Sequence, residues 1–291
     1  ADQQQFLQRN NMSETTPNTI TQGDCIRVFA RRTKWTPTDD LAFYDEPPLY
    51  DLPDLPVHIS VTFTWDVERG ALLMASWAMT GKEILLGGPA LSCYVDDFVP
   101  GRYIKQGVSF TSRGCPKHCP WCLVPSREGP IREIPIHPGH IVQDNNLLAC
   151  SREHIEAVFD MLRKQKQAIK FSGGLDCDYL SAWNVDLLKT IKVGELWVSC
   201  DTESALRKLD KARDMLWDFP TEKKRCYVLG GFEQEHPDNF EARCEAVYEK
   251  GFLPFAQLYQ PPDCWVNYTP QWKALARKWS RPAIYRSTVG T

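Results

Sequence analysis

The sequence predicts an α/β fold in which an open, partial (β/α)6 barrel follows a small, incomplete α/β unit. From residue 105 onwards, short strand-like segments alternate with amphipathic helical segments, and this alternation is typical of parallel sheets. The six strand-like segments fit an open barrel better than a closed eight-stranded one. We expect a flexible N-terminus at 1–20, the small α/β region at 21–104 and the barrel at 105–291.

The N-terminal α/β region contains three predicted strands and one predicted helix. Cys25–Ala30 and Glu83–Leu86 are short apolar segments, and Val57–Trp65 alternates and is rich in β-branched residues. Glu68–Met79 has apolar residues at helical spacing, so we expect a helix there. Residues 31–56 hold many Pro, Asp and Thr residues and are expected to form a long ordered loop.

The barrel region contains six predicted strands. They are Val108–Ser112, His140–Asn145, Ala168–Ser172, Glu195–Asp201, Arg225–Gly231 and Leu253–Tyr259. Between two of them, Ser151 precedes an apolar stripe at helical spacing, which predicts a capped helix. Further helices are expected at Thr202–Leu216, Asn239–Lys250 and Thr269–Ser280. Ligands bind at the C-terminal ends of the strands in such sheets, so we expect the functional residues there.

Composition limits the function classes. The formal net charge is −3 and no long basic run is present, so nucleic acid is disfavoured as a partner. No segment approaches the roughly 18 apolar residues of a membrane span, and we expect no membrane partner. The 11 cysteines are odd in number and no secretory signal precedes them, which argues against a disulfide framework. These features predict a cytoplasmic protein whose thiols are reduced and able to bind metal.

Cys115, Cys119 and Cys122 form the most informative motif, with the spacing Cys-x3-Cys-x2-Cys directly after the first barrel strand. Three thiolates on one tight loop can each bind one iron of a cubane cluster and leave the fourth iron open to a ligand. A zinc site that uses these cysteines with His118 or a distant Cys is an alternative. A cluster used only for electron transfer is another, although it usually has four Cys ligands.

This spacing, with Trp121 just before the third Cys, resembles the radical S-adenosylmethionine (SAM) superfamily. The resemblance implies a [4Fe–4S] cluster whose open iron binds the amino and carboxylate groups of SAM. Reductive cleavage of SAM then yields methionine and a 5′-deoxyadenosyl radical, which abstracts hydrogen from the substrate. It further implies an electron donor such as flavodoxin or ferredoxin. The charge balance favours a small-molecule or peptide substrate. A radical nucleic-acid modifying enzyme and a non-catalytic iron–sulfur or zinc protein remain as alternatives.

The same resemblance implies which residues contact SAM. They are Trp121 near adenine and the polar residues at three strand ends, namely Gln143, Asp144 and Asn145, then Ser172, Gly173 and Gly174, then Ser199 and Asp201. Two alternatives stay open. Gly173-Gly174 could form only a tight turn, and Asp201 could only cap the next helix. Asp176 could also serve as the acidic group that follows Gly173-Gly174.

The N-terminal region resembles a cut-down form of the Rossmann-like domain found in cobalamin-binding members of this superfamily. The usual Asp-x-His-x-x-Gly ligand signature is missing, so we expect no bound cobalamin. A methylthiotransferase would need a second three-Cys site in this half. Only Cys25 and Cys93 occur there, which disfavours that function.

Overall fold

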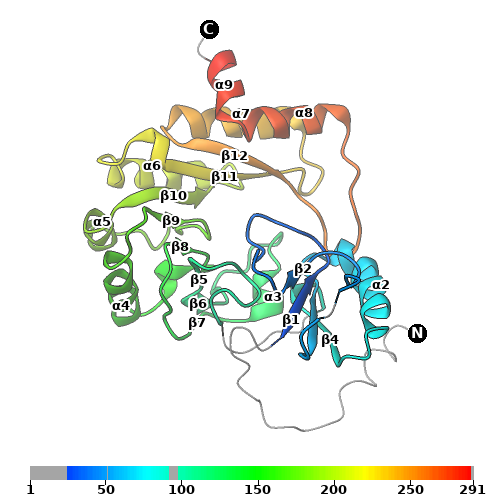
Figure 1. Ribbon diagram of the computed structural model, residues 1–291. Helices are drawn as coiled ribbons and strands as arrows, with labels where there is room; N and C mark the ends of the chain where they lie inside the picture. Colours follow the sequence, from blue (N-terminus) through cyan, green and yellow to red (C-terminus); the bar gives the residue numbers. More distant parts are fainter. Residues whose placement is uncertain (1–24, 51, 92–97, 290–291) are drawn as a thin grey trace.

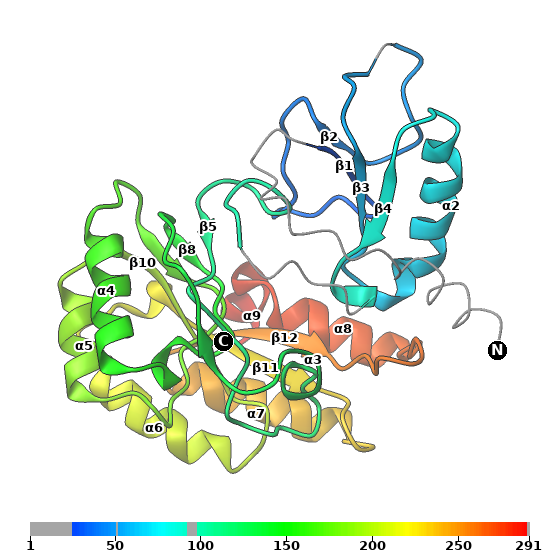
Figure 2. The same cartoon turned by 90° about the horizontal axis from the view of Figure 1, so that it is seen from below.

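The computed structural model describes residues 25–50, 52–91 and 98–289. The flexible N-terminus predicted at 1–20 lies outside the described residues. The described chain is α/β, with two parallel sheets and one short antiparallel pair (Figure 1). Figure 2 shows the N-terminal sheet with its helix on one side of the molecule and the larger sheet with its helices on the other.

The N-terminal sheet has the strand order β2-β1-β3-β4, and all its pairs are parallel. Its strands are β1 (Ile26–Phe29), β2 (Ala42–Phe43), β3 (Val57–Ser60) and β4 (Ile84–Gly87). One helix, α2 (Val67–Ala78), connects β3 to β4 and buries Leu73 and Trp77. Strand β2 lies within residues 31–56, which the sequence predicts to be a loop. A strand of two residues is too short to show a period-2 pattern, so the sequence does not reveal it.

The larger sheet has the strand order β12-β11-β10-β9-β8-β5, again with parallel pairs throughout. Its strands are β5 (Val108–Ser109), β8 (Ile141–Val142), β9 (Ile169–Phe171), β10 (Val193–Ser199), β11 (Lys224–Gly230) and β12 (Leu253–Leu258). Each of the six predicted barrel strands therefore contributes to one parallel sheet.

The predicted first barrel strand is shorter than expected. Strand β5 ends at Ser109, and Ser112 begins β6 (Ser112–Arg113), which pairs antiparallel with β7 (Arg132–Glu133). The β6–β7 pair therefore flanks the Cys loop, with β6 before it and β7 after it in the chain. The predicted strand Val57–Trp65 also ends early, because the chain turns after Ser60 into a 3-10 helix, η1 (Thr64–Asp66).

Helices pack along one face of the larger sheet (Figure 1). They are α4 (Arg152–Arg163), α5 (Ala182–Lys189), α6 (Ala205–Met215), α7 (Pro237–Glu249) and α8 (Pro270–Trp279). The last helix, α9 (Pro282–Val289), packs on α8 and points away from the sheet (Figure 1), and α3 (Val124–Glu128) follows the Cys loop. Ser151 caps α4 as predicted, accepting a hydrogen bond of 3.2 Å from the His154 N–H. Single 3-10 turns occur at η2 (Pro89–Leu91), η3 (Leu147–Ala149) and η4 (Thr221–Lys223).

Each sheet has its own hydrophobic core. Trp77 and Leu73 of α2 pack on β1 and β3 in the smaller cluster. The larger cluster fills the space between the six-stranded sheet and its helices, with Phe159 and Phe171 fully buried. Among the described helices, none combines the length and the apolar character that crossing a membrane requires.

Candidate metal and cofactor site

The Cys loop, residues 115–122, is closed at its base by a glycine. Gly114 has a φ of +80°, and a Cβ there would lie 2.1 Å from the carbonyl oxygen of Pro130. The Cys115 N–H donates to the Gly129 carbonyl oxygen at 3.2 Å. Only glycine allows the backbone at 114 to approach the backbone at 129–130 this closely. The segments before and after the three cysteines are therefore in direct contact.

Glu128, at the end of α3, ties this base to the neighbouring strand end. Its carboxylate pairs with Arg113 at 3.0 Å and accepts the Gly114 N–H at 3.2 Å. It also accepts the Asn145 side-chain amide at 2.7 Å. Asn145 follows β8, so the loop after β8 is joined directly to the base of the Cys loop.

The three thiols of Cys115, Cys119 and Cys122 are half-buried. The Lys117 N–H and the Asn146 side-chain amide both point at the Cys115 sulfur, at 3.5 and 3.6 Å. Burial raises the pKa of the Cys119 and Cys122 thiols, and the neighbouring cysteines raise it further. Three thiolates on one loop would therefore need a compensating positive charge, such as a metal centre.

Iron–sulfur chemistry fits this donor set. Across the described ranges, no three His, Cys, Asp or Glu side chains are grouped as ligands of one metal ion. A cubane cluster needs a wider spacing of the three thiols than a single metal ion does, because each thiol binds a different iron atom of the cluster. Thiolates are the soft ligands that such clusters use. In addition, the Asn146 side-chain oxygen beside Cys115 is buried without a hydrogen-bond partner among the described residues, so a bound molecule could supply its donor.

Lys117 links the Cys loop to the loop after β9. Its ammonium group lies 2.6 Å from a carboxylate oxygen of Asp176 and 2.7 Å from one of Asp178. Asn146 donates to the other Asp176 oxygen at 2.9 Å, and Lys208 of α6 also pairs with Asp178. Burial lowers the pKa of Lys117, but these bonds outweigh it and raise that pKa overall. The amine thus stays protonated and holds the loop after β9 against the Cys loop. Asn146 joins the loop after β8 to both.

Trp121 connects the Cys loop to the far strands of the sheet. Its side chain lies near Asp201, which follows β10 and accepts the Leu229 N–H at 3.0 Å. Its ring packs edge-on against Phe232 after β11, with 5.5 Å between centroids. Phe232 in turn packs against Tyr259 after β12 at 5.0 Å. Burial raises the pKa of Asp201. Groups that follow β8, β9, β10 and β11 therefore lie against the Cys loop, and Tyr259 after β12 is linked to it through Phe232.

At the end of β8, the predicted residues differ in their surroundings. Asp144 is buried, and its carboxylate accepts the Thr111 N–H at 2.6 Å, the Thr111 hydroxyl and the Ser112 hydroxyl at 3.0 Å. Burial raises the pKa of this carboxyl. The backbone N–H of Gln143 donates to Ser109 at 3.0 Å. Asp144 therefore joins β8 to the segment that leads into the Cys loop.

The predicted residues after β9 and β10 lie at the same edge of the sheet. Ser172 and Gly173 follow β9 directly, and a Cβ on Gly173 would lie 2.1 Å from the Asp144 carbonyl oxygen. Gly174 has a φ of +98° and nothing within 4 Å of its would-be Cβ. Ser199 ends β10 with an exposed side chain. Gly173 is thus needed for a close backbone approach, whereas Gly174 faces open space.

Several residues of the site were not among those predicted from the sequence. Asn146 contacts Cys115 and Asp178 contacts Lys117, while Glu128 accepts the Gly114 N–H at the base of the Cys loop. Asn146 is the last residue of the polar run Gln143-Asp144-Asn145-Asn146 at the end of the second predicted strand, and Asp178 lies two residues beyond Asp176, so the rule about strand ends points to both. Glu128 carries no such signal, because it follows no strand of the larger sheet.

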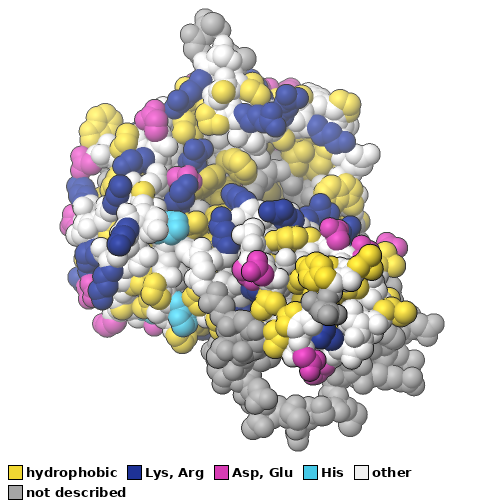
Figure 3. All heavy atoms as spheres, viewed as in Figure 1, with side chains coloured by type: hydrophobic (Ala, Val, Ile, Leu, Met, Phe, Trp, Pro, Cys, Tyr) yellow, Lys and Arg dark blue, Asp and Glu magenta, His cyan; other side chains and the backbone are white. Residues whose placement is uncertain are grey.

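The face of the larger sheet opposite its helices carries aromatic and charged groups. Trp197, Tyr227 and Phe255 alternate with core residues along β10, β11 and β12, and the Trp197 and Tyr227 rings stack at 4.3 Å. Glu195 accepts from Lys170 at 2.6 Å and from the Trp197 indole N–H at 2.9 Å. Figure 3 shows hydrophobic and basic side chains next to each other near the middle of the surface in this view. Such a face can hold a ligand with both apolar and polar parts.

Comparison of the chain with protein-family models and with curated proteins found no match.

Proposed function

We propose that this chain is a radical SAM enzyme in which Cys115, Cys119 and Cys122 hold a [4Fe–4S] cluster. One observation carries the proposal: the three-Cys loop lies at the carboxyl edge of an all-parallel six-stranded sheet, surrounded by polar and aromatic groups from other strand ends. This edge is where parallel α/β sheets bind their ligands. We also propose that the six-stranded sheet and its helices form a partial (β/α)6 barrel.

Such a cluster supplies one-electron reduction of SAM, which yields methionine and a 5′-deoxyadenosyl radical. The protein's part is to orient SAM and to exclude water. The buried oxygen of Asn146 can accept an N–H of the methionine amino group. The open surface around Gly174 and the exposed Ser199 hydroxyl can line the rest of SAM. Trp121, which packs edge-on against Phe232, can pack on adenine and shield the cluster.

We further propose that the substrate, a small molecule or a peptide, binds on the aromatic face formed by Trp197, Tyr227 and Phe255. A protein electron donor such as flavodoxin or ferredoxin would supply the electron. Lys117 does not offer a free charge for docking that donor, because two carboxylates already neutralise it. The described cysteines are all free thiols, which suits a reducing cytoplasmic setting.

Anaerobic reconstitution with iron and sulfide tests the proposal. The wild-type chain should bind about four irons per chain and release 5′-deoxyadenosine from SAM when reduced with dithionite. Cys119→Ala should lose both properties, because one iron then lacks its thiolate. Cys264→Ala is the matched control, since that exposed Cys lies outside the loop, and it should retain both.

Two results would contradict the proposal. The first is SAM cleavage by Cys119→Ala at the wild-type rate. The second is a wild-type protein that takes up one zinc ion per chain and no iron, which would favour a structural zinc site.

A further inference from the structure

The N-terminal sheet has a topology that creates a second ligand position. In the order β2-β1-β3-β4, the chain leaves β1 towards β2 on one side and leaves β3 towards β4 on the other. The loops after β1 and β3 therefore run in opposite directions along the sheet and leave a crevice between them. In open parallel sheets, ligands bind in the crevice outside the carboxyl ends of the strands at such a switch point.

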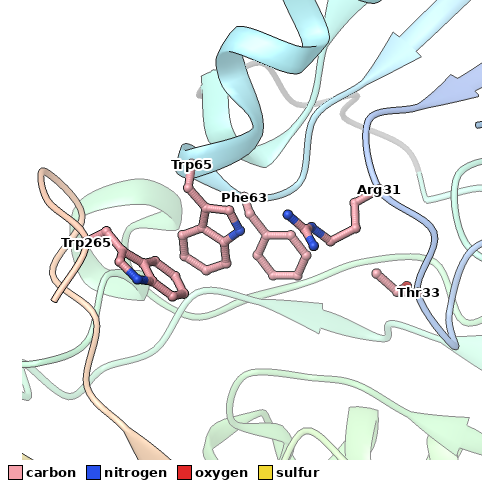
Figure 4. Close-up of a pocket in the computed structure, with 5 residues that line it drawn as sticks. All are labelled: Arg31, Thr33, Phe63, Trp65 and Trp265. Atoms are coloured by element: carbon pink, nitrogen blue, oxygen red, sulfur yellow. The ribbon is translucent and has the colours of Figure 1, made fainter. Parts of the chain in front are cut away.

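A depression of about 490 Å³ lies at this point, lined by Arg31, Thr33, Phe63, Trp65 and Trp265 (Figure 4). Its size is within the usual range for small-ligand sites. Phe63 and Trp65 stack at 4.8 Å with nearly parallel rings, and Trp265 meets Trp65 edge-on at 5.1 Å. Trp65 is 45% exposed and Trp265 is 62% exposed. Large apolar rings gathered at the surface are typical of a binding site.

A second depression, of about 370 Å³, adjoins the first and shares Arg31 with it. Arg32 and Arg69 also line it, so three arginines border one hollow, together with Asp45 and Tyr44. The Arg32 guanidinium group lies over the Tyr44 ring, 5.1 Å from its centroid. Arg69 pairs with Asp45 at 3.0 Å. Arginine clusters of this kind recognise phosphate through paired N–H donors.

Arg31 is held in position between the two depressions. Its guanidinium group forms two hydrogen bonds with Asp66, at 2.7 and 2.6 Å, while its side chain remains 53% exposed. Asp66 precedes α2, yet its side chain does not cap that helix. Instead, η1 runs directly into α2, and the N–H of Val67, the first residue of α2, donates to the Thr64 carbonyl oxygen.

We propose that this switch point binds a nucleotide, with its planar base against Trp65 and Trp265 and its phosphate on Arg31, Arg32 and Arg69. Aromatic side chains bind bases by stacking. Here arginines take the place of a glycine-rich phosphate loop, since Ala30-Arg31-Arg32 follows β1 directly. The nucleotide could be free or could be the 5′ end of a single strand. The site uses no cysteine, so it does not depend on the proposed cluster.

Isothermal titration of the full chain tests this site. AMP should bind with a Kd below about 1 mM, and adenosine should bind more weakly because it lacks the phosphate. A short 5′-phosphorylated single-stranded oligonucleotide serves as the other source. Binding of AMP alone indicates a free nucleotide, and tighter binding of the oligonucleotide indicates a strand end; either result supports the site.

Three variants make the test specific. Trp265→Ala should weaken AMP binding about 5- to 150-fold, the range measured for lost base stacking. Arg32→Gln should weaken AMP but leave adenosine unchanged. Trp217→Ala is the control, because Trp217 is 78% exposed and lines neither depression. Failure of both AMP and the oligonucleotide to saturate, or equal affinities of wild type and Trp265→Ala, would overturn the proposal.

Discussion

Replacing Gly173 by Ala should destabilise the protein through one backbone contact beside the Cys loop. Gly173 follows β9, and the backbone of Asp144 after β8 passes directly over it. A Cβ at this position would lie 2.1 Å from the Asp144 carbonyl oxygen, with the Gln143 carbonyl carbon and the Asp144 nitrogen at 2.7 and 2.8 Å. All three atoms belong to the backbone, so no side-chain rotation can relieve the overlap.

The cost follows from the movement that is required. The contact must open from 2.1 Å to at least 3.0 Å, the lower limit for Cβ contacts. That shift moves the backbone of Asp144, whose buried carboxylate holds Thr111 and Ser112. Overpacking of this kind costs about 3 kcal/mol. For a chain of this length, with an unfolding entropy of about 0.6 kcal/mol per degree, the melting temperature should fall by about 5 °C.

Gly174→Ala is the matched control. Its Cβ would meet nothing within 4 Å, so only the φ of +98° opposes the substitution, at a cost of about 1 kcal/mol. Thermal melts followed by circular dichroism compare the two variants under identical conditions. If Gly173→Ala melts no lower than Gly174→Ala, the close approach of the two strand ends does not control stability and the reasoning is wrong.

Two further predictions concern charges. Burial and the charge of Arg102 lower the pKa of His58 to about 4, below its value in the unfolded chain. The stability that depends on the neutral ring is therefore fully present above about pH 6.5. About 2 kcal/mol of the free energy of unfolding should be lost as the pH falls to about 4.5. His58→Gln should remove this part of the pH dependence in urea unfolding. Glu235→Gln should cost about 3 kcal/mol in the same assay, because Arg243, 2.6 Å away and 8% exposed, would keep a buried charge without its counter-ion.

Both predictions have clear contradicting results. An identical acid sensitivity of wild type and His58→Gln would exclude His58 as its source. For the buried pair, Glu222→Gln is the control, because its bond to Arg286 is exposed on both sides and should contribute less than about 1 kcal/mol. Equal losses in the two Glu variants would show that burial of the Arg243 pair does not matter.

Local patterns predicted most of the secondary structure. The six strands of the larger sheet and the capped helix α4 occur where periodicity and capping residues indicate them. The predictions were least accurate where strands are very short. Strand β2 and the β6–β7 hairpin have two residues each, so their pairing comes from tertiary contacts and leaves no period in the sequence.

The candidate site was predicted in outline only. The cysteine spacing identifies the loop, and the strand-end rule identifies the edge where its neighbours lie. The contacts themselves join distant positions, such as Asn146 with Asp176 and Lys117 with Asp178. Such pairs depend on the order of strands across the sheet, which a single sequence does not specify.

The sequence by itself determined the α/β class, the Cys-x3-Cys-x2-Cys loop and its position after the first strand of the larger sheet, because these depend on residue spacing along the chain. Only the tertiary structure decided that Asp144 is engaged by Thr111 and Ser112, and that Trp265 meets Trp65 across about two hundred residues. The physical reason is that burial and contact between distant segments arise when the sheets assemble. Periodicity describes how one element is built, whereas packing describes which elements meet.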